Sequence, residues 1–182
     1  MFFIHPDFCE TEKFQYLVIP KNASCTITKI IEETMNHSWV NRKNLDKVRW
    51  TVIRDPYERF VSGLQYDLER HSINLDEINI NECFYANITN PANGLKGNIN
   101  HSSSQVPYLI NTEINYYIDI KDLDIFLKMH FGKSLNINKT INKKELNIKK
   151  ETVMKYLNLE YNLYNLILNS PFLWKWQQGK IF

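Results

Sequence analysis

The sequence lacks the features that mark membrane, secreted and metal-binding proteins. No apolar stretch approaches the roughly 20 residues that a transmembrane helix needs, and Met1–Asp7 has neither the basic start nor the long apolar core of a signal peptide. The three cysteines, Cys9, Cys25 and Cys83, are odd in number and do not have the spacing of metal ligands. We therefore expect a cytoplasmic protein with reduced thiols, no membrane partner and no bound metal.

A strong charge of either sign is also missing. The 22 lysines and arginines nearly balance the 20 acidic residues, the formal net charge is +2, and no basic run is interleaved with aromatics. This balance argues against a nucleic-acid partner. The hydrophobic content of 43% is that of a globular protein rather than a disordered one. With 182 residues, the chain is expected to form a single domain, 1–182, with a sizeable core.

The stretch Phe14–Thr26, FQYLVIPKNASCT, predicts a strand, a tight turn and the start of a helix. The apolar run Tyr16–Ile19 indicates a strand buried on both faces, which a proline ends. Apolar and small residues then recur at helical spacing, namely Ile27, Ile30, Ile31 and Thr34. We expect a helix over Ser24–Asn36, with Ser24 or Thr26 as its cap.

This arrangement is typical of a phosphate-binding loop. A strand that turns tightly into a helix leaves free N–H groups at the helix N-terminus, and Lys21 adds a positive charge beside them. The loop for nucleoside triphosphates has the pattern G-x-x-x-x-G-K-[ST], whereas this turn has no glycine and its lysine comes first. A cysteine phosphatase needs an arginine soon after its nucleophile, but none follows Cys25 until Arg42. A capped turn without a ligand is the alternative.

A second strand–turn–helix unit follows the first. Val48–Ile53 is a short strand rich in β-branched residues, and Arg54 stands at its carboxyl end. Asp55 and the proline after it suit the cap and the first position of a helix that ends near His71. Ligands bind at the carboxyl edge of parallel sheets. Basic residues at two such strand ends, Lys21 and Arg54, therefore suit a ligand with two separate phosphate groups.

Four further elements are expected later in the chain. Ile114–Ile120 reads as a strand, Lys121–Phe131 as a helix, and Leu75–Tyr85 as a short helix. A final helix that ends before Pro171 is indicated by an apolar stripe of residues three and four apart: Met154, Leu157, Tyr161, Tyr164 and Leu168.

The motifs at the two turns resemble those of sulfotransferases that use 3′-phosphoadenosine 5′-phosphosulfate (PAPS). Pro20–Thr26, PKNASCT, resembles the 5′-phosphosulfate loop of the carbohydrate branch, P-K-x-A-[SC]-T. Arg54–Ser62, RDPYERFVS, resembles the 3′-phosphate motif, R-[DE]-P-x-x-R-[FL]-V-S. The resemblance covers most of the chain from Phe14 onward and is specific at these two motifs. It implies an α/β fold, a three-layer sandwich with a short central parallel sheet and a P-loop-like strand–phosphate-loop–helix.

The resemblance also implies roles for individual residues. The phosphosulfate would be bound by the loop residues Lys21, Asn22, Ala23, Ser24, Cys25 and Thr26. Arg54 and Ser62 would hold the 3′-phosphate through charge-assisted hydrogen bonds. Asn98–Leu109 resembles an H-x-x-x-Q/V-x-x-x-L segment of the family, with serine in place of the tryptophan or proline often found beside the histidine; its His101 is the expected general base. A late family loop that returns to the nucleotide corresponds to Asn138, Lys139 and Thr140.

The expected function is in-line transfer of a sulfuryl group from PAPS to an acceptor hydroxyl on a carbohydrate. Lys21 would neutralise the charge that grows on the leaving phosphate, and direct transfer needs no cysteine nucleophile. A phosphate-transfer enzyme such as a kinase is the second hypothesis; it needs a magnesium-binding carboxylate at a strand end, where Asp55 is the candidate. A member that binds nucleotide without catalysis is the third. Lipid, peptide and phenol acceptors also stay open.

Overall fold

A computed structural model describes residues 7–72, 74, 101–102, 104–110, 112–135, 146 and 148–182. The short helix expected over Leu75–Tyr85 lies outside these residues. Within the described ranges, no helix combines the length and the apolar character that crossing a membrane requires.

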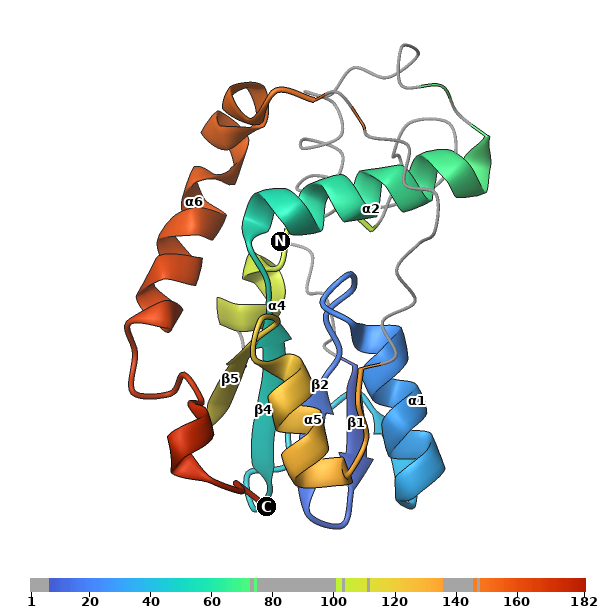
Figure 1. Ribbon diagram of the computed structural model, residues 1–182, viewed down its shortest axis with the longest axis vertical. Coiled ribbons are helices and arrows are strands. Elements are labelled where there is room, and N and C mark those ends of the chain that lie inside the picture. The colour runs from blue at the N-terminus through green and yellow to red at the C-terminus, as the bar shows by residue number, and fades with distance from the viewer. Residues whose placement is uncertain are drawn as a thin grey trace.

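A five-stranded mixed sheet in the order β3-β1-β2-β4-β5 forms the centre of the protein (Figure 1). Its strands are β1 (Phe8–Thr11), β2 (Phe14–Leu17), β3 (His37–Val40), β4 (Val48–Ile53) and β5 (Tyr116–Asp119). Strands β2, β4 and β5 run parallel to one another, as expected. Strand β1 is antiparallel to both of its neighbours. The prediction of a parallel sheet is therefore correct for three strands and wrong for the sheet as a whole.

The hairpin of β1 and β2 explains why the first predicted strand is shifted. At its turn, the Thr11 hydroxyl accepts hydrogen bonds from the backbone N–H groups of Lys13 and Phe14, at 3.3 and 3.2 Å. Pairing with β1 then sets β2 at Phe14–Leu17 rather than at Tyr16–Ile19. All four residues of β2 are buried, which confirms the prediction that this strand is covered on both faces.

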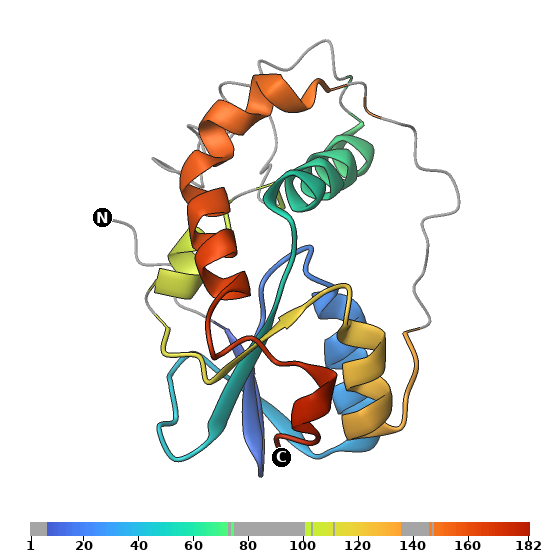
Figure 2. The same ribbon diagram turned by 60° about the vertical axis from the view of Figure 1, so that its left-hand side comes forward.

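Helices cover both faces of the sheet. They are α1 (Ser24–Thr34), α2 (Pro56–His71), α4 (Val106–Ile110), α5 (Leu123–Phe131) and α6 (Lys150–Leu168). Figure 2 shows α1 and α5 on one side of the sheet and α4 and α6 on the other. The first pair packs on alternate strand residues, Phe14, Tyr16, Trp50, Val52 and Ile118. The second pair covers strand residues on the opposite face of the sheet, Phe8, Leu17 and Ile53. The α/β class is confirmed.

Helix α2 leaves the carboxyl end of β4 and packs along α6. Their contact is an apolar cluster made of Phe60, Leu64, Leu68, Val153 and Leu157. The predicted cap is also confirmed, because the Asp55 carboxylate accepts a hydrogen bond from the N–H of Glu58 at 3.0 Å and Pro56 is the first helical residue. These contacts fix α2 above the sheet edge where β2 and β4 end.

A glycine lets the chain at residues 101–102 lie directly against α2. A Cβ atom built on Gly63 would lie 2.6 Å from the backbone nitrogen of Ser102 and closer still to the carbonyl group of His101. Because these neighbours are backbone atoms, they have no flexible side chain that could move aside. While residues 101–102 keep this position, position 63 accommodates glycine but no residue with a Cβ atom.

We expect Gly63→Ala to lower the free energy of unfolding by about 1–3 kcal/mol, the usual cost of forcing a methyl group into a closely packed site. Helix propensity alone predicts the opposite sign, since alanine is favoured over glycine inside a helix by about 1 kcal/mol. Urea denaturation followed by circular dichroism measures the difference. A Gly63→Ala protein as stable as the wild type, or more stable, would contradict the close contact.

Candidate functional site

The loop between β2 and α1 contains two residues with unusual backbone angles. Lys21 and Ala23 have φ values of +65° and +61°, in the left-handed region that residues other than glycine rarely adopt. Such strain is concentrated at functional sites. Ala23 occupies the cap position of α1 and no side chain caps the helix, so the prediction that Ser24 or Thr26 does so is wrong. The left-handed turn at Ala23 takes the place of a side-chain cap.

Without a side-chain cap, the first N–H groups of α1 stay available. Those of Thr26 and Ile27 both donate to the Ala23 carbonyl oxygen, at 3.1 Å. Those of Ser24 and Cys25 make no hydrogen bond within the described residues. Free N–H groups at the N-terminus of an 11-residue helix favour a bound anion. The Cys25 thiol is exposed and unpaired.

Arg54 lies beside this loop, as the order of the strands requires. Since β2 and β4 are parallel neighbours, the residues that follow them meet at one edge of the sheet. The Arg54 Nη1 atom donates to the carbonyl oxygen of Lys21 at 3.3 Å, and its Nε atom lies 3.5 Å from Glu58 Oε2. The two basic residues that the sequence singled out are therefore brought together.

Two buried amide side chains join the loop to the Arg54 turn. The Asn22 Nδ2 atom donates to the carbonyl oxygen of Val52 at 2.7 Å and to Gln105 Oε1 at 2.9 Å. The Gln105 Nε2 atom in turn donates to the carbonyl oxygen of Arg54 at 3.1 Å. Asn22 is fully buried and Gln105 is 1% exposed. Three segments that are distant in the sequence are thus fixed to one another by hydrogen bonds shielded from water.

The ammonium group of Lys21 lies over an aromatic ring of α2. Its Nζ atom is 3.4 Å from the centroid of the Tyr66 ring, a cation–π contact. Burial lowers the pKa of Lys21 below its ordinary value, while the nearby Asp67 carboxylate opposes that shift. The positive charge of Lys21 is therefore held against the Tyr66 ring of α2, partly shielded from water.

His101 also contacts Tyr66. The two rings are 4.5 Å apart between centroids and meet edge to face. His101 Nδ1 lies 2.6 Å from Asp67 Oδ1, and the backbone N–H of His101 donates to Asp67 Oδ2 at 3.0 Å. Asp67 is completely buried. A histidine oriented by a buried carboxylate is a common form of general base.

The other described histidine side chains lie elsewhere. His130 Nδ1 is 2.9 Å from the carbonyl oxygen of Phe126, and its Nε2 accepts a hydrogen bond from the N–H of Ile181 at 2.9 Å. His37 belongs to the edge strand β3 and lies 3.9 Å from Glu32. Of the histidine side chains that the structure describes, His101 is the one beside the loop.

The remaining expected site residues divide into two groups. Ser62 lies on α2 two turns after Arg54, and its hydroxyl makes no hydrogen bond within the described part of the chain. Asn138, Lys139 and Thr140 lie outside the described residues, so their predicted contact with the nucleotide stays a prediction.

The second arginine of the RDPYER motif forms a buried ion pair. Arg59 Nε lies 2.9 Å from Glu160 Oε1 on α6, and both residues are almost fully buried. The Arg59 Nη2 atom also donates to the carbonyl oxygen of Ser102 at 3.4 Å. Arg59 therefore ties α2, α6 and the His101 segment together and does not face the loop.

Both acidic residues at the ends of β4 and β5 accept hydrogen bonds from tyrosines of α6. The Tyr161 hydroxyl lies 3.0 Å from each Asp55 oxygen, and the Tyr164 hydroxyl lies 3.1 Å from Asp119 Oδ2. Asp119 Oδ1 also accepts from the N–H of Lys121 at 3.0 Å. Among the residues described, no group of three or more histidine, cysteine or acidic side chains is arranged to hold a metal ion.

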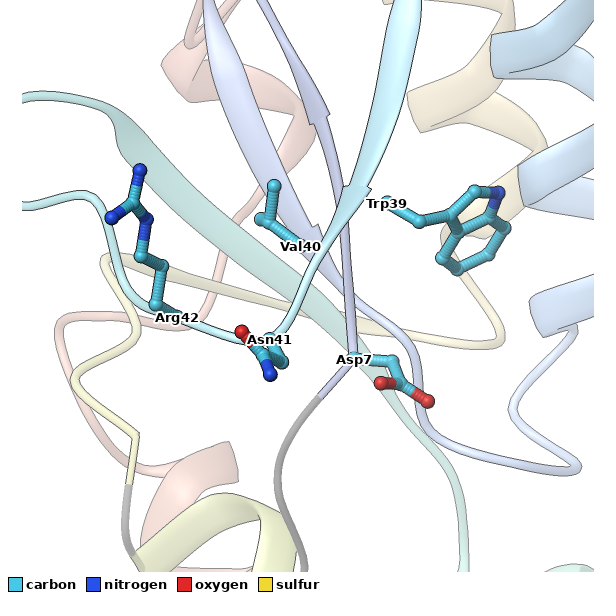
Figure 3. A pocket seen from close by; sticks show the side chains of 5 residues that line it. All are labelled: Asp7, Trp39, Val40, Asn41 and Arg42. Atoms are coloured by element: carbon cyan, nitrogen blue, oxygen red, sulfur yellow. The ribbon is translucent and has the colours of Figure 1, made fainter.

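A separate cavity of about 390 Å³ opens along β3 and is lined by Asp7, Trp39, Val40, Asn41 and Arg42. Figure 3 shows the Trp39 ring and the Arg42 guanidinium pointing away from each other on either side of Val40. Its polar groups do not converge on one point, and none of the loop residues lines it. We therefore place the candidate site at the loop and not at this cavity.

Sequence reasoning missed Tyr66, Asp67 and the amide link through Gln105. A signal for Asp67 was present, because it falls seven residues after Phe60 and three after Leu64, on the apolar face of its helix. A carboxylate at a core position needs a buried partner. The identity of that partner, 34 residues away, depends on the fold.

Comparison of the chain with protein-family models, with curated proteins and with solved structures finds no match. The function must therefore be inferred from the residues and their geometry.

Glu160→Gln is expected to lower the free energy of unfolding by about 3–5 kcal/mol, because it leaves the buried Arg59 guanidinium without a counter-charge. The double variant Arg59→Met/Glu160→Leu, which removes both charges at similar volume, should recover most of the loss. Urea denaturation of the single and double variants gives both values. If the free energy of unfolding of Glu160→Gln lay within 1 kcal/mol of the wild-type value, the buried Arg59 guanidinium would not need the negative charge of Glu160.

Proposed function

We propose that the protein is a PAPS-dependent sulfotransferase that acts on a hydroxyl group of a carbohydrate. The observation that carries the proposal is the hydrogen-bonded link from Asn22 through Gln105 to Arg54. It holds side by side the two turns whose sequences resemble the 5′-phosphosulfate and 3′-phosphate motifs. A ligand with phosphate groups at both ends of a ribose matches two adjacent cationic positions better than a single phosphate does.

The groups around the loop fit such a donor. Free N–H groups at Ser24 and Cys25 and the ammonium of Lys21 suit the phosphosulfate end. The Arg54 guanidinium and the Ser62 hydroxyl, which makes no hydrogen bond among the described residues, suit the 3′-phosphate, since arginine can give phosphate two parallel hydrogen bonds. PAPS, when bound, supplies the sulfuryl group and leaves as 3′-phosphoadenosine 5′-phosphate.

The chain itself supplies a base and a positive charge. His101 is 29% exposed, so an acceptor hydroxyl can reach its ring and transfer a proton to it. Lys21 stabilises the negative charge that develops on the phosphate as the bond to sulfur breaks. Both residues contact Tyr66, so the base and the positive charge lie beside the same aromatic ring. Catalysis in this arrangement depends on positioning and electrostatics, as in phosphoryl transfer.

The contacts of the acidic residues favour sulfuryl transfer over magnesium-dependent phosphate transfer. Asp55, which lies two residues after β4, and Asp119, which ends β5, already accept hydrogen bonds from protein donors. The His101–Asp67 pair favours an active enzyme over a module that only binds nucleotide, because a binding module needs no oriented base. Activity that persists in excess EDTA would separate the sulfotransferase from the kinase.

The first prediction concerns the nucleotide. 3′-Phosphoadenosine 5′-phosphate should raise the melting temperature, because a ligand that binds the native state at 100 times its Kd stabilises it by about 2.7 kcal/mol. Adenosine 5′-phosphate should raise it far less. Arg54→Ala should weaken the bisphosphate by roughly 1.5–3 kcal/mol, while Arg42→Ala, which removes a charge at the β3 cavity, serves as the control. Equal stabilisation by the two nucleotides would rule out the 3′-phosphate site.

The second prediction concerns Lys21. Lys21→Ala should reduce kcat about 100- to 1000-fold, as removal of one transition-state donor does, and should change the affinity for 3′-phosphoadenosine 5′-phosphate much less. Lys29→Ala, on the exposed face of α1, is the matched control. Burial lowers the pKa of Lys21, so the residue loses its positive charge at a lower pH than an ordinary lysine does. Wild-type turnover should therefore fall with rising pH before an ordinary lysine would be deprotonated. Unchanged kcat in Lys21→Ala at saturating PAPS would refute the role.

A further inference from the structure

We infer that Asp67 is a positioning residue that holds His101 with its proton on Nδ1, so that Nε2 is free to accept the proton of the acceptor hydroxyl. The inference rests on the proposed function and assigns a role to a residue outside both motifs. It follows from the contacts of α2 with the segment that carries His101.

Three residues of α2, spaced four apart, form a track for this segment. Arg59 donates to the carbonyl oxygen of Ser102 at 3.4 Å, and Gly63 leaves room for the backbone of both segment residues. Asp67 accepts the N–H of His101 at 3.0 Å. Residues at this spacing lie along one face of a helix. The backbone on both sides of the His101 side chain is thus held by contacts that do not involve the imidazole.

The carboxylate of Asp67 then determines the state of the ring. Its Oδ1 lies 2.6 Å from His101 Nδ1, and the residue is completely buried, so water cannot replace the imidazole as its partner. An ionised carboxylate accepts hydrogen bonds and cannot donate them, so Nδ1 must carry the proton. In the neutral ring, Nε2 is therefore the unprotonated nitrogen. Nε2 makes no hydrogen bond within the described residues.

The charges around the ring suit a proton acceptor. Asp67 stabilises the imidazolium that forms when a proton arrives. On the α2 side, Arg70 has its Cζ 6.0 Å from the Tyr66 centroid, and Glu69 precedes it in the same turn. On the loop side, Lys21 faces Tyr66. Lys21 therefore provides the positive charge for the leaving phosphate, and Asp67 provides the buried negative charge for the base.

The acceptor oxygen forms a bond to sulfur while the bond between sulfur and the bridging phosphate oxygen breaks, and the electron pair of that bond stays on the phosphate. The hydroxyl proton moves to Nε2 of His101. Asp67 stays ionised throughout and keeps its hydrogen bond to Nδ1.

The tautomer of His101 can be measured without any activity assay. In full-length protein labelled with ¹⁵N-histidine, two-bond ¹H–¹⁵N correlation spectra at a pH where the ring is neutral should show the proton on Nδ1. His101→Gln identifies the signal. His130 is an internal reference for the same tautomer, because its Nδ1 faces the Phe126 carbonyl oxygen and its Nε2 accepts a hydrogen bond. A proton on Nε2 of His101 would overturn the inference.

Asp67→Asn tests the consequence for catalysis. An asparagine amide can donate to Nδ1 and would move the proton to Nε2, so kcat at neutral pH should fall about a hundredfold or more, with the KM for PAPS unchanged. Asp67→Glu should restore part of the activity. Asp124→Asn, in an exposed pair with Lys128, is the control.

The outcomes separate this inference from the proposed function. If sulfuryl transfer occurs but Asp67→Asn keeps the wild-type kcat, Asp67 has no positioning role and the sulfotransferase assignment stands. If no acceptor is sulfated, the assignment fails, and the tautomer spectrum still reports whether Asp67 orients His101. If Asp67→Asn does not fold, the wild-type spectrum and Asp67→Glu decide the question.

Discussion

The contact on which the rest of the site depends is the buried hydrogen bond between the side chains of Asn22 and Gln105. Each amide also donates to the backbone near the end of β4, so the β2–α1 loop, the Arg54 turn and the Gln105 segment are held as one unit. An unpaired amide in this position would cost about 1–3 kcal/mol. Separating the three segments would therefore leave buried amide groups without hydrogen-bond partners. This coupling lets a loop without glycine keep two left-handed residues in place.

Helix α2 connects this unit to the proposed base through polar contacts along its length. At one end, Asp55 caps it and receives the Tyr161 hydroxyl of α6. In its first turn, Arg59 forms a buried ion pair with Glu160 of α6. Toward its far end, Asp67 holds His101. The polar contacts that keep α2 rigid also fix the position of the proposed base, so stability and function share the same residues.

Local patterns predicted most of the elements. The apolar run before the loop, the β-branched strand Val48–Ile53 and the stripes of the later helices each reflect burial along one element, which periodicity reports directly. Strands β1 and β3 were missed for a different reason. They exist because β1 folds back on β2 through the Thr11 turn and β3 then pairs with its free edge, and pairing between segments leaves little trace in either sequence. The meeting of Lys21 with Arg54 was predictable from parallel strand order. The link through Gln105 and the pairing of Asp67 with His101 join residues that are far apart in the chain, so only the fold reveals them.

The most direct test of the central claim is transfer of radioactive sulfate from ³⁵S-labelled PAPS to a panel of saccharide acceptors, with excess EDTA present. The account predicts a labelled saccharide and an equal amount of 3′-phosphoadenosine 5′-phosphate, both absent when Arg54 and Lys21 are replaced together by alanine. Absence of labelled product with every acceptor, together with no binding of 3′-phosphoadenosine 5′-phosphate to the wild-type protein, would contradict it.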